Sequence, residues 1–94
     1  MIKHIVFTRF ETPNEHAPVA AELLNALVGT IPEIVTLETG RDVTRSERSY
    51  DLALIVTFRS REDLAAYDHH PAHEAARAYI RAHRTATASV DFEF

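Results

Sequence analysis

Imidazole and phenol side chains cluster in one short stretch of the sequence, LAAYDHHPAHEAARAYI, at residues 64–80. The seven residues 67–73 include three histidines, one tyrosine and one proline. An imidazole titrates near neutral pH and is a common metal ligand, so this cluster could transfer protons or hold a metal ion. It could also be a polar junction between two helices without any chemical role.

His73 is the strongest candidate for a general base. A helix is expected to begin at Pro71, and on a helical wheel His73 lies at the margin of its apolar side, beside Ala76 and Ile80. The first turn of a helix disfavours a positive charge. We therefore expect a neutral, half-buried imidazole that could accept a proton near pH 7.

Two further side chains could converge on His73. His4 stands in the middle of an apolar first strand, and Tyr67 ends a short helix on its apolar side. If the His4 face of the strand looks at the helices, all three groups share one interior. Histidines buried in strands often only complete hydrogen bonds, so a structural role stays open for each of them.

The other histidines are expected to have structural roles. His69 should point to solvent, and His70 should mark a helix boundary because the residue before a proline avoids the helical conformation. His83 falls at a helix C-terminus, which favours an imidazolium. His16 falls in the expected loop ETPNEHAP.

A metal site is the competing hypothesis for the cluster. His69 and His70 lie four and three residues before His73, within the range of helical metal pairs. Pro71 interrupts that spacing, and no acidic residue completes a recognisable motif. Two glycines are too few for a phosphate-binding loop. We expect no metal and no cofactor.

The elements that must position these groups follow from periodicity and turn residues. The pattern β-α-β-β-α-β predicts a single α+β domain over residues 1–94, with an antiparallel sheet and the helices on one face, the ferredoxin-like arrangement. The expected strands are residues 2–10, 34–40, 50–58 and 86–94, and the expected helices begin near Pro18, Ser60 and Pro71, the first ending at Gly29 and the last near His83.

The first strand is apolar on both faces. Ile2, His4 and Val6 share one face, whereas Ile5 and Phe7 lie on the other. With helices on one face only, the second face needs a different cover. A second copy of the chain, packed sheet against sheet, provides it, so we predict a homodimer with two-fold symmetry.

Composition limits the partners and the chemistry. The 94 residues carry a net charge of −4 with both signs interspersed, so neither nucleic acid nor an anionic membrane is an expected partner. The absence of cysteine excludes disulfides, thiolate nucleophiles and cysteine-bound metals. The opening MIKHIVFTRF reads as a strand and not as a signal peptide, which favours a cytoplasmic location.

Several segments resemble one known family. The stretches IKHIVFTRF, GRDVT, YDLALIVTFRSREDLAAYDHHPAH and VDFEF are similar to the stress-responsive A/B barrel (dimeric A/B barrel) domain, and the likeness covers nearly the whole chain. This resemblance implies a ferredoxin-like subunit and a tight homodimer whose two sheets form a barrel. Members include plant stress proteins and a polyketide cyclase that performs an intramolecular aldol condensation without metal or cofactor.

The resemblance also implies site residues. The base of that cyclase would fall on His73, its tyrosine partner on Tyr67 and its first-strand histidine on His4, while His70 matches a histidine of the HPAH stretch.

Two polar residues of the cyclase pocket are apolar in this chain. A tyrosine of its first helix falls on Leu24, and a histidine of its third strand falls on Leu52. We expect Leu24 and Leu52 to contact a ligand, together with His70, but the cyclase substrate does not carry over.

The leading hypothesis is therefore a homodimeric barrel that binds a small, partly apolar carbonyl compound, with cofactor-free proton transfer or aldol chemistry. His73 would take a proton next to the carbonyl, Tyr67 would donate a hydrogen bond to the enolate oxygen, and His4 would orient the substrate or shuttle a proton. One alternative is a non-enzymatic, stress-responsive structural dimer. Another is a cofactor-free monooxygenase on the same barrel.

Overall fold

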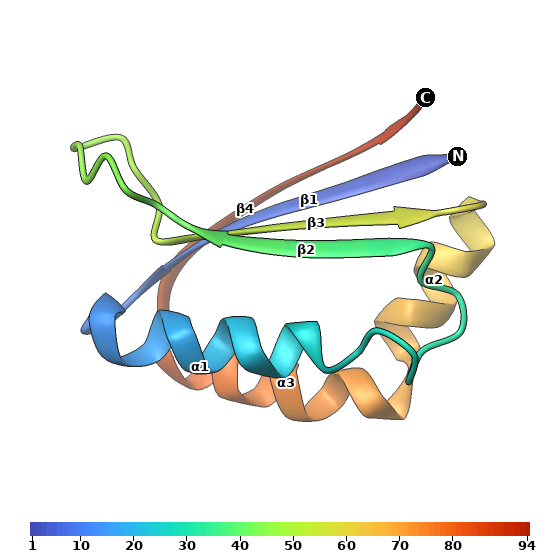
Figure 1. Cartoon of the computed structure of the whole chain (residues 1–94), viewed down its shortest axis with the longest axis horizontal. Helices are drawn as coiled ribbons and strands as arrows, with labels where there is room; N and C mark the ends of the chain where they lie inside the picture. Colours follow the sequence, from blue (N-terminus) through green and yellow to red (C-terminus); the bar gives the residue numbers. More distant parts are fainter.

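One antiparallel sheet and three helices make up the fold, which a computed structural model describes for all 94 residues, Met1–Phe94. The helices lie together on one face of the sheet (Figure 1). None of the three helices has the length and apolar composition of a membrane-spanning segment. In chain order the elements are β1 (Ile2–Phe10), α1 (Pro13–Asn25), β2 (Thr36–Arg41), β3 (Leu52–Phe58), α2 (Arg61–His69), α3 (Pro71–His83) and β4 (Arg84–Glu93).

The strand order is β2-β3-β1-β4, with every neighbouring pair antiparallel. This is the ferredoxin-like α+β arrangement predicted from the sequence. β1 lies at the centre, so the first and last strands of the chain are neighbours. The strand register places His4 of β1 opposite Asp91 of β4 on one side and opposite Val56 of β3 on the other.

The core lies between the sheet and the helices. Along β3, the alternate residues Leu52, Leu54, Val56 and Phe58 are all buried. β3 also lies inside the sheet, between β2 and β1, which suits its apolar sequence. The same face of β1 carries His4, which is how an imidazole comes to lie under the helices.

The start of the first helix was predicted wrongly. α1 begins at Pro13 and not at Pro18, and Pro18 lies inside it. Pro13 occupies the first turn, where its missing N–H is not needed, so the turn-like residues that suggested a loop in fact start the helix. Pro18 forgoes a single hydrogen bond to the carbonyl of Asn14. Consequently His16 belongs to a helix and not to a loop.

The boundary between α2 and α3 is where the sequence predicted it. The Ser60 hydroxyl accepts a hydrogen bond from the backbone N–H of Asp63 at 3.1 Å and so caps α2. His70 has an extended backbone before Pro71, and its Nδ1 accepts from the backbone N–H of Ala72 at 3.0 Å. The ring of His70 therefore caps α3, and only this one residue separates the two helices.

The other face of the sheet has no cover within the chain (Figure 1). Phe7, Val90, Phe92 and Phe94 on β1 and at the end of the chain remain between 41% and 61% exposed. This is the bare apolar face that the two-sided first strand predicted.

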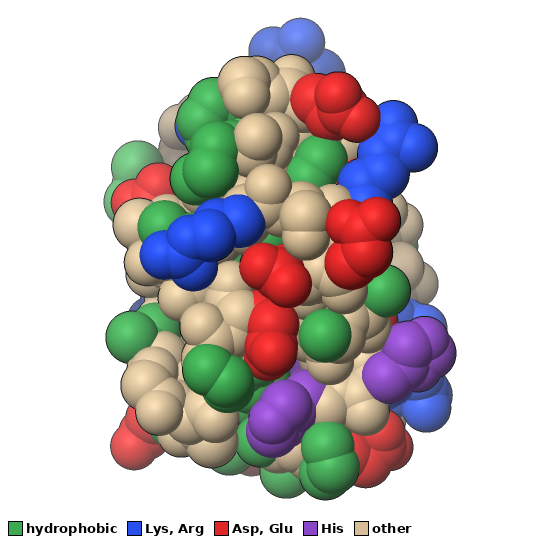
Figure 2. Space-filling model, turned by 90° about the vertical axis from the view of Figure 1, so that its right-hand side faces the viewer, with side chains coloured by type: hydrophobic (Ala, Val, Ile, Leu, Met, Phe, Trp, Pro, Cys, Tyr) green, Lys and Arg blue, Asp and Glu red, His purple; other side chains and the backbone are tan.

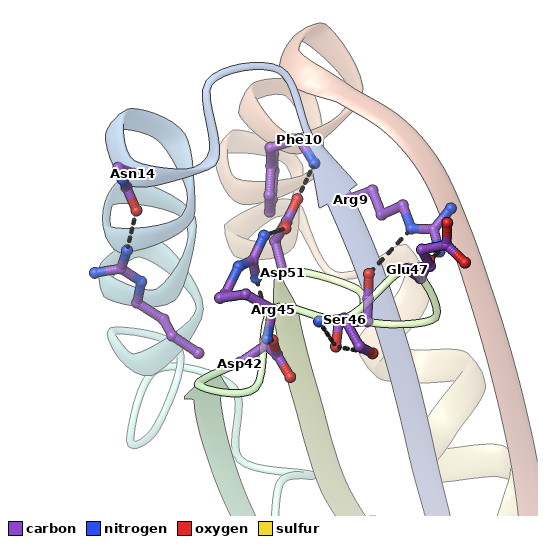
Figure 3. A network of polar contacts seen from close by, with 10 residues as sticks. Arg9, Phe10, Asn14, Asp42, Arg45, Ser46, Glu47 and Asp51 are labelled. Carbon is purple, nitrogen blue, oxygen red and sulfur yellow. Dashed lines mark hydrogen bonds and ion pairs between the residues drawn. The ribbon is translucent and has the colours of Figure 1, made fainter.

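The loop between β2 and β3 is tied to the end of β1 (Figure 3). The buried carboxylate of Asp51 accepts from the backbone N–H of Phe10 at 2.7 Å and from Nη2 of Arg45 at 2.5 Å. Asp51 also donates its own backbone N–H to the carbonyl of Thr8 at 2.9 Å. The rest of the loop rises on the bare side of the sheet (Figure 1).

Candidate functional site

A cavity of about 220 Å³ lies between the sheet and the helices. Side chains from β1, β3, β4 and all three helices line it. The lining brings together five of the six site residues predicted from the sequence, which are His4, Leu24, Leu52, Tyr67 and His73. The volume is below the range of drug-sized ligand pockets, so the cavity suits a small molecule.

Tyr67 is fully buried at the centre of this group. Its ring lies 4.3 Å from the His73 ring and 6.0 Å from the His4 ring, measured between centroids. The hydroxyl has no hydrogen-bond partner in the protein, which is rare for a buried polar group and unfavourable for folding. Burial, reinforced by the charge of Asp68, raises the pKa of the phenol well above its usual value, so the hydroxyl keeps its proton and can donate it to a ligand.

His73 is half-buried, and its pKa is lowered by burial first and then by the positive charge of Arg77. Its Nδ1 lies 3.1 Å from Nη2 of Arg77. A guanidinium can only donate hydrogen bonds, so Nδ1 must carry the lone pair, and the proton of the neutral ring is on Nε2. This agrees with the neutral imidazole expected from the helix position.

His4 has the opposite arrangement. Its Nδ1 is hydrogen-bonded to the carboxylate Oδ1 of Asp91, and its side chain is only 13% exposed. A carboxylate can only accept, so Nδ1 carries a proton, and in the neutral ring Nε2 is the nitrogen with the lone pair. A carboxylate that orients an imidazole in this way also stabilises the imidazolium that forms when the ring takes a proton.

The remaining histidines lie outside the cavity. His70 caps α3 and is not among the lining residues, and His69 is exposed. His16 and His83 stack on each other at 3.9 Å where α1 and α3 meet, and Tyr79 hydrogen-bonds His16 at 2.8 Å. No three histidine, aspartate or glutamate side chains are arranged to hold a metal ion.

The surface at the α2 end carries charges of both signs without a patch of one sign (Figure 2). The histidines visible on this face gather in its lower half, at the level of the helices. The interspersed charge agrees with the charge pattern of the sequence.

Four charged residues of the site were not predicted from the sequence. Asp68, Arg77 and Arg84 line the cavity, and Asp91 bonds His4. Helical spacing could have indicated Arg77, because it follows His73 by four residues. Asp91 could be recognised only once β1 and β4 were paired in the correct register.

Replacing His73 by glutamine should make stability less dependent on pH. The pKa of His73 in the folded state lies below its unfolded value of about 6.5. The neutral ring therefore contributes fully to the free energy of unfolding above about pH 6.5, and this contribution is lost as the pH falls through the folded-state pKa. Urea unfolding between pH 8 and pH 5 should show a larger loss for the native chain than for His73→Gln. The exposed-site control His69→Gln should keep the native loss, and equal losses in the native chain and His73→Gln would refute the assignment.

Comparison with known proteins is consistent with the fold and the sequence pattern. A family model described as "Stress responsive A/B Barrel Domain" matches residues 2–94. No protein with a curated description matches the sequence significantly.

Solved structures with the same fold come from several organisms. A dimeric protein of unknown function with a ferredoxin-like fold from Bacteroides fragilis is 27% identical, with a TM-score of 0.91 over 99% of this chain and 95% of its own. A dimeric ferredoxin-like protein of unknown function from Thermobifida fusca is 28% identical, with a TM-score of 0.86 over 99% and 90% of the two chains. A hydroxynitrile lyase from Passiflora edulis shares the fold at 16% identity, with a TM-score of 0.83 over 97% and 90%.

Proposed function

Because this chain belongs to the stress responsive A/B barrel domain family, we propose that it forms a homodimer whose cavity binds a small, partly apolar carbonyl compound and transfers a proton next to the carbonyl. The observation that carries the proposal is the Tyr67 hydroxyl, which is buried without a partner in a cavity that two imidazoles also line. A carbonyl oxygen is an acceptor that would satisfy this hydroxyl.

The hydrogen bonds support His4 as the base. Its Nε2 takes a proton from the carbon beside the carbonyl, and the electron pair of the broken C–H bond moves onto the carbonyl oxygen. The Tyr67 hydroxyl donates to the enolate oxygen that forms. Asp91 stabilises the imidazolium through the bond to Nδ1. The enolate can then recover a proton or attack a second carbonyl of the same molecule, which is an aldol reaction.

This division of roles differs from the one expected from the sequence, in which His73 was the base and His4 its auxiliary. The lone pair of His73 is already occupied by Arg77, and the positive charge of Arg77 opposes a second positive charge beside it. We therefore assign His73 as a positioning residue, which packs against the Tyr67 ring and holds the phenol.

The bare sheet face supports the homodimer. Its exposed apolar side chains are those that a sheet-to-sheet contact would cover, and the relatives from Bacteroides fragilis and Thermobifida fusca are described as dimeric. Two sheets facing each other would form the barrel. The hydroxynitrile lyase from Passiflora edulis is an example of a lyase with this fold.

Deuterium exchange tests the chemistry without knowledge of the natural substrate. In D₂O at pH 7, the native chain should accelerate the exchange of the protons beside the carbonyl of 2-heptanone, followed by proton NMR. His4→Gln should slow this exchange by about 10²- to 10⁴-fold, the usual contribution of a general base, and Tyr67→Phe should slow it by about 10²-fold. His69→Gln, an exposed histidine outside the cavity, is the matched control and should exchange like the native chain.

The non-enzymatic structural dimer predicts the opposite outcome. Neither acceleration of the exchange nor an increase in melting temperature with 2-heptanone or a β-dicarbonyl compound would then be seen. That pair of results would refute the proposed function and leave the cavity as a structural void.

A further inference from the structure

One face of α3 runs along the whole cavity. His73, Arg77 and Ile80 of α3 line it at successive spacings of four and three residues, which keeps them on one side of the helix. Arg84 also lines it, as the exposed first residue of β4, directly after the last residue of α3. At 1.5 Å per residue, α3 extends about 15 Å from His73 to its last residue, so the cavity is elongated along the helix.

The strands opposite α3 also place different side chains at the two ends of the cavity. His4 lies at one end of the lining of β1 and Thr8 at the other, about 13 Å apart for four residues of strand. Thr8 pairs with Thr87 of β4, and Arg84 begins the same strand. The imidazoles and the phenol therefore lie at one end of the cavity, and two hydroxyls and an arginine lie at the other.

The charges are unevenly distributed between these two ends. Arg77 is held near the imidazole end by Asp68, whose carboxylate lies 3.8 Å away and whose backbone carbonyl accepts a hydrogen bond from it. Arg84 makes no ion pair and no side-chain hydrogen bond in the protein. No carboxylate of the lining lies beside it, because Asp68 is the only acidic residue there.

The cavity is consequently more positive than the molecule around it. Its lining holds two arginines and one aspartate, whereas the whole chain has a net charge of −4. A guanidinium binds a carboxylate through two parallel hydrogen bonds. An unpaired arginine at the end of a cavity in an acidic protein is therefore suited to an anionic group of the ligand.

The wall between the two ends is partly apolar. Leu24, Leu52 and Leu54, all buried, face the cavity from α1 and β3. Leu24 and Leu52 are the two leucines that the family resemblance predicted to contact a ligand. This wall suits a short hydrocarbon chain between two polar groups.

We propose that the ligand is an oxo acid, with its carbonyl at Tyr67, its carboxylate at Arg84 and a short apolar chain along the leucines. The placement of the carbonyl group at Tyr67 rests on the proposed function. The new element is a carboxylate of the same ligand bound by Arg84. It gives Arg84 the role of a specificity-determining residue, since it would select acids over neutral ketones of the same length.

The test compares 7-oxooctanoate with its methyl ester by isothermal titration calorimetry on the native chain at pH 7. The acid should bind about tenfold more tightly, which corresponds to about 1.4 kcal/mol, and its advantage should shrink as salt is added. Arg84→Gln should abolish the difference between acid and ester, and Arg84→Lys should keep part of it. Arg81→Gln removes an arginine of α3 that is exposed, as Arg84 is, but does not line the cavity, and it should behave like the native chain.

The outcomes separate the two proposals. If the ester binds as tightly as the acid and Arg84→Gln changes neither affinity, the anionic end is refuted while the carbonyl site stands. If neither compound binds and 2-heptanone exchange is also not accelerated, both proposals fall. If the acid binds more tightly but Arg81→Gln abolishes the difference as fully as Arg84→Gln, the preference comes from general surface charge and the role of Arg84 is refuted.

Discussion

Replacing Val90 by glutamate should convert the proposed homodimer into monomers. Val90 is 61% exposed on the bare face and pairs with Ile5 at the centre of the sheet. In a two-fold symmetric interface the change occurs in both copies, so two carboxylates would be buried without partners. Each would cost several kcal/mol. A total of about 5.5 kcal/mol corresponds to a dimer about 10⁴-fold weaker. Sedimentation equilibrium at micromolar concentration should find twice the chain mass for the native protein and the single-chain mass for the variant.

Val28→Glu is the matched control for the dimer. Val28 is similarly exposed, at 55%, but lies in the turn after α1, within the helical layer. Its replacement should leave the mass of the assembly unchanged. A native chain that sediments as a monomer, or a Val28→Glu variant that dissociates as fully as Val90→Glu, would contradict an interface on the bare face. Far-UV circular dichroism should show that both variants keep the fold.

The strands and the last two helices could be predicted because local signals determine them. The alternation along β1 and β3, the Ser60 cap and Pro71 at the start of α3 all depend on residues close together in the chain. The start of α1 could not be predicted, because ETPN fits a turn as well as the first turn of a helix. Ala17 is buried in the hydrophobic core, so tertiary packing favours the helix over the turn at this position.

The candidate site was predictable in its residue types and not in its connections. A strand imidazole and a helix-start imidazole can be expected to share an interior from periodicity alone. Which atoms bond to them depends on contacts that are remote in sequence, such as Asp91 beside His4, 87 residues away. Those contacts set the tautomers, and the tautomers in turn shift the proposed base from His73 to His4.

The buried carboxylate of Asp51 completes the sheet where β3 stops pairing with β1. The ladder between the two strands ends at Thr8 and Leu52, and beyond it the backbone N–H of Phe10 has no strand carbonyl to bond. Asp51 supplies a carboxylate oxygen at 2.7 Å in its place (Figure 3). The next residue, Leu52, lines the cavity, so the same contact holds both the loop and one wall of the site.

Asp51→Ala should therefore lower the free energy of unfolding by about 3 kcal/mol, a large share of the 5–15 kcal/mol typical of a domain. The substitution leaves the buried N–H of Phe10 unsatisfied, which costs about 1–3 kcal/mol, and it releases the loop that Arg45 ties to the same carboxylate. Asp51→Asn keeps an acceptor for Phe10 and should lose about half as much. Urea unfolding followed by circular dichroism measures both. Asp42→Ala, which removes a more exposed carboxylate that also bonds Arg45, should be milder than either. If all three variants were equally stable, the bond from Phe10 would not hold the strand end.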